Sequence, residues 1–103
     1  MNFNQAEKMA IVKTIAETIV LDDHYKVGEL MYLDELMNML NFDVQFMERA
    51  KQLSSQKTVE VLQNMTKEKK EALVIMIDKM TESDGDVHQK EKDFLVNLIR
   101  ILG

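Results

Sequence analysis

Carboxylates are the side chains of this chain whose types and spacing most clearly suggest chemistry. Asp84 and Glu91 lie seven residues apart in the segment MTESDGDVHQKE, residues 80–91. Asp22 and Glu29 repeat that spacing 62 residues earlier. Carboxylate oxygens suit hard divalent cations such as Ca²⁺ and Mg²⁺, but acids also cap helices. The first question is therefore which of these two roles the acidic turns serve.

The second turn can be compared with the calcium loop of EF-hands, whose pattern is D-x-[DN]-x-[DN]-G-x₅-E. With Gly85 at loop position 6, Asp84 falls at position 5 and Glu91 at position 12. Met80, however, falls at position 1, and a thioether does not suit Ca²⁺. The first turn has Asp23 where the pattern needs glycine. We therefore do not expect a functional EF-hand pair.

Helix capping accounts for the same residues in another way. Gly85 can end a helix with a positive φ, and Asp86 can cap the next helix, with Gln89 completing a capping box. Asp84 would then stand at a helix C-terminus, where the dipole disfavours an acid. This conflict suggests a basic neighbour or a cation, so capping and weak cation binding both stay open.

The elements that must position these turns follow from apolar periodicity of about 3.6 residues. The expected helices cover residues 5–21, 28–40, 44–53, about 57–64, a stretch that starts at Thr66, and about 87–102. Asn4 with Glu7 indicates a capping box, Asp43 an N-cap, and Asn41 a left-handed helix end. Six helices with short connections predict an all-α, single-domain bundle over residues 1–103.

An internal repeat relates the two acidic turns. Residues 8–41 align with residues 70–103 at an offset of 62 without a gap, and nine of the 34 positions are identical. The repeat places both acidic pairs at the same turn between two helices. We therefore predict two pseudo-symmetric helix hairpins, with residues 42–69 as a helical insert.

Composition excludes several classes of function. The net charge of −5 argues against a nucleic-acid partner, and the absence of cysteine excludes disulfides and thiolate chemistry. No apolar run is long enough for a transmembrane segment. Neither a nucleophile motif nor a phosphate-binding glycine loop is present, so we do not expect an enzyme. His24 and His88 are interpreted as exposed turn residues because no zinc-ligand spacing accompanies them.

Apolar side chains support an alternative to metal binding. The nine methionines are interpreted mainly as core residues, and the last helix shows an apolar stripe at Phe94, Leu95, Leu98, Ile99 and Leu102. An exposed face of Met and Leu would instead bind another protein or a second copy of the chain. The basic segment 66–71 is interpreted as a solvated helix start.

The segment TESDGDVHQKEKDFLVNLIRILG resembles the TerB family of tellurite-resistance proteins. The resemblance rests on an Asp-Gly turn, an apolar residue two positions after the glycine, and a glutamate six positions after it. These are Asp84, Gly85, Val87 and Glu91 here. The segment VLDDHYKVGELMYLDELMNML resembles the more divergent first copy, with Asp23 where glycine is usual.

This resemblance implies an all-helical, cytoplasmic and non-enzymatic protein linked to metal stress. It also implies that acidic residues bind a divalent cation, Ca²⁺, Mg²⁺ or Zn²⁺. Transferred to this sequence, the candidate metal ligands are Asp84, Glu91, Asp22 and Glu29. The missing glycine of the first copy weakens the match at Asp22 and Glu29.

Overall fold

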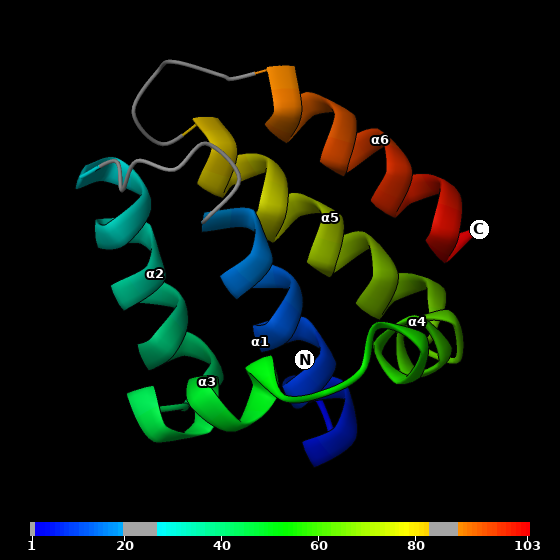
Figure 1. Ribbon diagram of the computed structural model, residues 1–103, viewed down its shortest axis with the longest axis horizontal. Helices are drawn as coiled ribbons and strands as arrows, with labels where there is room; N and C mark the ends of the chain where they lie inside the picture. The colour runs from blue at the N-terminus through cyan, green and yellow to red at the C-terminus, as the bar shows by residue number, and fades with distance from the viewer. Residues whose placement is uncertain (1, 20–26, 83–88) are drawn as a thin grey trace.

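The computed structural model describes residues 2–19, 27–82 and 89–103 of the chain. These residues form six α-helices and no strand (Figure 1). The helices are α1 (Gln5–Ile19), α2 (Val27–Leu40), α3 (Val44–Lys51), α4 (Ser55–Gln63), α5 (Lys67–Glu82) and α6 (Gln89–Leu102). The predicted all-α bundle of six helices is therefore confirmed. In the part of the chain described, no helix is both long and apolar enough to cross a membrane.

Two helix starts form as the sequence predicts. The Glu7 N–H donates to Oδ1 of Asn4 at 2.8 Å, and the Asn4 N–H donates to Oε1 of Glu7 at 2.9 Å. This is the reciprocal capping box at the start of α1. Asp43 caps α3, because its Oδ1 accepts from the N–H of Phe46 at 2.8 Å. Each bond satisfies an amide that no carbonyl within the helix can reach.

The start of α4 differs from the expectation. The sequence predicts a helix from about residue 57, whereas α4 begins at Ser55. Ser54 lies before it in an extended conformation, and its Oγ accepts from the N–H of Lys57 at 3.1 Å. Serine is unfavourable inside a helix but strongly favoured as an N-cap. The apparent break in the pattern is therefore the helix start itself.

The end of α2 also agrees with the sequence. Asn41 has the left-handed conformation, with φ 57°. The N–H of Phe42 then donates to the carbonyl of Met37 at 3.0 Å, which is the long bond of a Schellman motif. Phe42 is buried in a cluster with residues of α1 and α3. This turn therefore directs the chain from α2 back onto α1.

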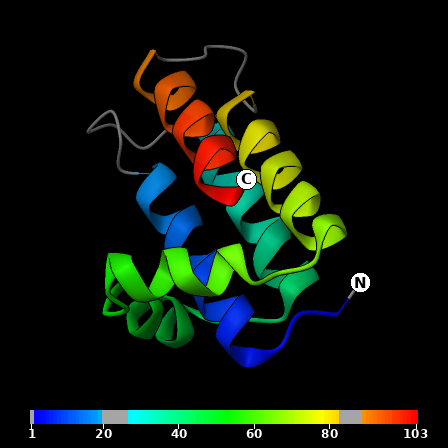
Figure 2. The ribbon, with the colours of Figure 1, turned by 90° about the vertical axis from the view of Figure 1, so that its right-hand side faces the viewer.

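Helix α1 is the element around which the others are arranged. It contacts α2, α3, α4 and α5, while α5 also contacts α2 and α6. Figure 1 shows α1 and α2 as one antiparallel hairpin and α5 and α6 as another. In both views, α3 and α4 lie at the end of the bundle away from the C-termini of α1 and α5 (Figures 1 and 2). The pseudo-symmetry between the two hairpins stays a prediction.

The main core lies between the two hairpins. Its largest fully buried side chains are Ile11, Ile15, Leu36, Leu62, Leu73, Ile77 and Met80. A second cluster joins α1 to α3 and the preceding turn, and consists of Val12, Ala16, Phe42, Met47 and Ala50. Each face of α1 thus packs on a different partner.

The methionines only partly match the interpretation as core residues. Met47, Met65, Met76 and Met80 are buried. Met31 and Met39 on α2 are instead 66% and 63% exposed. Methionine is flexible enough to fill core gaps, but nothing in its type alone decides which face of a helix it occupies.

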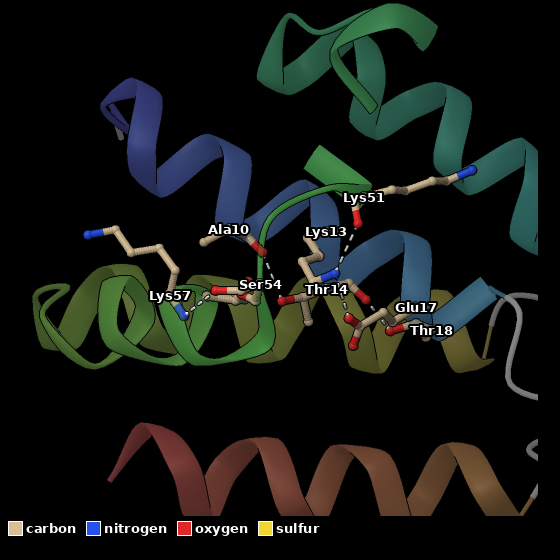
Figure 3. Close-up of polar contacts among 9 residues, drawn as sticks. Ala10, Lys13, Thr14, Glu17, Thr18, Lys51, Ser54 and Lys57 are labelled. Carbon is tan, nitrogen blue, oxygen red and sulfur yellow. Dashed lines mark hydrogen bonds and ion pairs between the residues drawn. The ribbon is translucent and has the colours of Figure 1, made fainter. Parts of the chain in front are cut away.

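Two threonines show how α1 tolerates burial on several sides. The Thr14 hydroxyl donates to the carbonyl of Ala10 at 2.9 Å, and the Thr18 hydroxyl donates to the carbonyl of Thr14 at 2.8 Å (Figure 3). A buried hydroxyl costs stability unless it is hydrogen-bonded. Both hydroxyls are satisfied within α1 and need no partner from another helix.

The core assignment predicts a clear difference between two substitutions. Ile15→Ala should lower the free energy of unfolding by about 2–5 kcal/mol, because it leaves a cavity where Ile15 is fully buried. Met31→Ala should change it by about 0.5 kcal/mol or less, because that side chain is mostly exposed. Urea denaturation followed by circular dichroism measures both. Equal losses would contradict the assignment.

Candidate functional site

Four helix ends gather at one end of the bundle. They are the C-termini of α1 and α5, at Ile19 and Glu82, and the N-termini of α2 and α6, at Val27 and Gln89. Two perpendicular views show all four at the same end (Figures 1 and 2). The chain therefore enters and leaves both predicted acidic turns at this end.

The four predicted metal ligands are placed only in part. Asp22 and Asp84 lie outside the described residues. Glu29 and Glu91 are each the third residue of their helices, α2 and α6, and their side chains lie outside the described part. A helix N-terminus favours a carboxylate at such a position. The other turn residues interpreted above, His24, Gly85, Asp86 and His88, also lie outside it.

The described residues contain no other candidate metal centre. Within residues 2–19, 27–82 and 89–103, no group of three or more His, Asp or Glu side chains is arranged to hold an ion. Three of the acids there each pair with one lysine: Glu7 with Lys69, Glu17 with Lys13, and Glu48 with Lys51. A cation site with three or more such ligands would therefore have to include residues of the predicted turns.

A groove of about 490 Å³ lies between α1, α4 and α6. Its polar lining consists of Thr14, Glu17, Ser55, Thr58, Asp93 and Asn97. The Thr58 hydroxyl, like that of Thr14, donates to the carbonyl four residues earlier. Asp93 accepts a hydrogen bond from Nε2 of Gln89 at 3.0 Å. A catalytic hydroxyl would instead be bonded to a base that takes its proton.

Side-chain hydrogen bonds join two of the helices that line this groove to neighbouring helix ends. The Lys13 Nζ donates to the carbonyl of Lys51 at 3.2 Å, at the C-terminus of α3, and contacts Glu17 at 3.3 Å (Figure 3). A cation is favourable there because the last carbonyls of a helix carry partial negative charge. On α4, Gln63 donates from Nε2 to the carbonyl of Ile101 near the end of α6 at 3.0 Å. These bonds join α1 to the end of α3 and α4 to the end of α6.

A second groove of about 440 Å³ lies between α5 and α6. From the sequence, residues 66–71 are expected only as a solvated helix start, and Ile99 as part of an apolar stripe. The structure instead places Lys67 and Lys70 in the groove lining and leaves Ile99 half-exposed. In the sequence, the run of six apolar residues at 72–77 could have indicated that α5 leaves some apolar side chains exposed. A single helix face cannot bury six consecutive side chains.

Shifted pKa values often indicate functional sites. Among the described residues, the resolved shifts are those of Glu7 and Tyr32. The hydrogen bond from Lys69, together with the N–H of Asn4, holds the pKa of Glu7 below its usual value of 4.5. Burial raises the pKa of Tyr32, and the charge of Glu35 adds to this. Neither group lines either of the two grooves described above, and we attribute both shifts to packing and capping.

The ion pair between Glu7 and Lys69 joins the starts of α1 and α5. Its nitrogen and oxygen lie 2.8 Å apart, and both side chains are mostly buried. The two residues are 62 positions apart, which equals the offset of the predicted repeat. A twofold relation brings equivalent positions together only near its axis. The contact therefore agrees with such a relation between the hairpins.

Comparison with known proteins supports the fold. No protein-family model matches the sequence, and no curated protein matches it. Among solved structures, the chain is similar to the crystal structure of a protein of unknown function, PG1108, from Porphyromonas gingivalis W83. The TM-score is 0.83 at 18% sequence identity, and the match covers 100% of this chain and 86% of that one. At this identity, the similarity concerns the fold alone.

The pair between Glu7 and Lys69 predicts a pH-dependent contribution to stability. Glu7→Gln keeps the capping box, since Gln serves there too, but removes the charge. At pH 7 it should lower the free energy of unfolding by about 1 kcal/mol or less. In the folded protein the pKa of Glu7 lies below 4.5. The difference in unfolding free energy between the two proteins should therefore vanish as the pH falls below 4.5 and through the pKa of Glu7 in the folded state.

Denaturation of both proteins at pH 7 and pH 3 measures this difference. Glu48→Gln is the matched control, because its pair with Lys51 is largely exposed and should contribute little. A loss for Glu7→Gln that is equal at both pH values would show that the charge is not its source.

Proposed function

We propose that this chain is a non-enzymatic helical binding module that binds a divalent cation weakly. The proposed site lies at the end of the bundle where α1 and α5 end and where α2 and α6 begin. Its ligands would be Asp84 and Glu91, assisted by Asp22 and Glu29. The observation that carries the proposal is the gathering of these four helix ends, which flank both acidic turns (Figure 1).

Electrostatics support cation binding at this end. Helices α1 and α5 direct their negative dipole ends there and α2 and α6 their positive ends, so the dipoles offset and the negative charge comes from the carboxylates of the two predicted turns. Several acids in one small region repel one another unless a counter-charge is present. A hard cation with oxygen ligands supplies that charge, and Ca²⁺ and Mg²⁺ fit it better than Zn²⁺.

The resemblance to the TerB family extends the proposal to biology. By that resemblance we expect a cytoplasmic protein connected to the response to metal or tellurite stress.

A metal-free interaction module is the second candidate function. Large apolar side chains on the surface of three helices favour it. They are Leu30, Met31 and Met39 on α2, Ile75 on α5, and Val96, Ile99 and Ile101 on α6. Contiguous exposed apolar surface commonly marks a contact with another protein. In this case the acids would serve as caps, and the partner would be another protein or a second copy of the chain.

Cation titration separates the two candidates. Addition of Ca²⁺, Mg²⁺ or Zn²⁺ to the ¹⁵N-labelled chain should move backbone amide signals of residues 19–29 and 82–91 with a Kd of about 1 mM or weaker, as for weak extracellular calcium modules. The paired variant with Asp84→Asn and Glu91→Gln should weaken binding by about tenfold or more.

Glu60→Gln is the matched control for these variants. Glu60 is exposed on α4, at the other end of the bundle, so its loss should leave the titration unchanged. If about 10 mM of each cation moves no signal at either turn, the cation proposal fails and the interaction module remains.

A further inference from the structure

The groove between α5 and α6 has the apolar exposure of a contact surface. Ile75 on α5 is 54% exposed, and Ile99 on α6 is 49% exposed. Val96 is 55% exposed and lies one turn before Ile99 on the same side of α6. Val74 and Leu102 complete the apolar lining. Ile75 and Ile99 therefore remain half in water in the groove, and Val96 extends this exposed apolar surface along α6. A partner that buries these side chains would gain free energy.

The charges around this groove are mainly positive. Lys67 and Lys70 line it at the start of α5, and neither forms an ion pair with any described residue. Glu71 is the acid in the lining. Outside the lining, Lys92 and Arg100 are exposed on α6 one turn before and one turn after Val96, and Asp78 lies on α5 one turn after Val74. This local surplus of basic groups contrasts with the net charge of −5 of the whole chain.

Shape, apolarity and charge together define the partner. We infer that the groove between α5 and α6 binds an amphipathic helix of another protein, apolar along one face and acidic beside it. Its apolar side chains would cover Ile75 and Ile99, and its carboxylates would face Lys67 and Lys70. Helix-in-groove binding of this kind uses apolar anchors at i, i+3, i+4 and i+7. The inference builds on the second candidate function and does not depend on the cation site.

A second copy of the chain fits this groove less well. In a symmetric dimer the same surface meets itself, so a groove whose lining carries Lys67 and Lys70 against Glu71 would meet a second groove with the same net positive charge. Like charges brought together across an interface are unfavourable. An acidic helix from a different protein removes this repulsion and pairs the free lysines.

Two synthetic peptides of about 15 residues test the inference. Both carry the same leucine stripe at helical spacing, but one has glutamates and the other lysines beside it. Each is titrated into the ¹⁵N-labelled full chain in the presence of EDTA, so that the cation site plays no part. We expect the acidic peptide to move amide signals along residues 67–78 and 95–103, and the basic peptide to move none.

Variants then locate the binding. Ile99→Glu should weaken binding of the acidic peptide by about tenfold or more, because it places a charge among the anchors. The double variant Lys67→Glu, Lys70→Glu should weaken it similarly and should bind the basic peptide instead. Met39→Glu is the matched control, since Met39 is also an exposed apolar residue, at 63% against 49% for Ile99, but lies on α2, and it should change nothing. Circular dichroism verifies that each variant is folded.

Several results would overturn the inference. Equal binding of both peptides would show that charge does not select the partner. An absence of shifts along α5 and α6, with the chain folded, would show that the groove accepts no helix. A dimer in sedimentation analysis that Ile99→Glu dissociates would assign the groove to a second copy; it would retain the interaction module but reject the acidic partner.

Discussion

Burial of α1 on several sides is the constraint that the rest of the bundle satisfies. Its apolar residues fall into two separate clusters, one shared with the hairpins and one with α3. Such a helix is buried along most of its length, so its hydroxyls bond to its own carbonyls and its charged side chains reach other elements or water. Glu7 lies at the N-terminus with Lys69, and Lys13 reaches out to α3. The insert between the hairpins is thus needed to cover α1.

At one end of the bundle, side chains bond to backbone carbonyls of other elements. At the end where α3 and α4 lie, side chains from neighbouring helices occupy exposed carbonyls: Lys8 that of Asn41, Lys13 that of Lys51, and Gln63 that of Ile101. These bonds tie helix ends together and stiffen that end. The candidate cation site lies at the other end, and the groove proposed for a partner helix is lined by residues of α5 and α6 together with Gly103.

The sequence could predict what depends on neighbouring residues. The caps at Asn4 and Asp43 and the left-handed Asn41 follow from contacts within three to five positions, and all three form. The half-exposed state of Ile99 could not be predicted, because it depends on how far α5 covers α6. For the candidate cation site, spacing identified the four acids and the fold brought their helices together, but ligand geometry depends on turn conformations that periodicity does not encode.

The contact between Glu7 and Lys69 bears on how such a chain could arise. If two identical hairpins once associated as separate copies, equivalent positions near the twofold axis carried the same residue and so the same charge. An attractive ion pair between them was then impossible. Only once the two copies were encoded separately could one position become Glu and the other Lys. The pair would then be a mark of divergence after duplication, and it would favour the fused arrangement over any return to exchangeable halves.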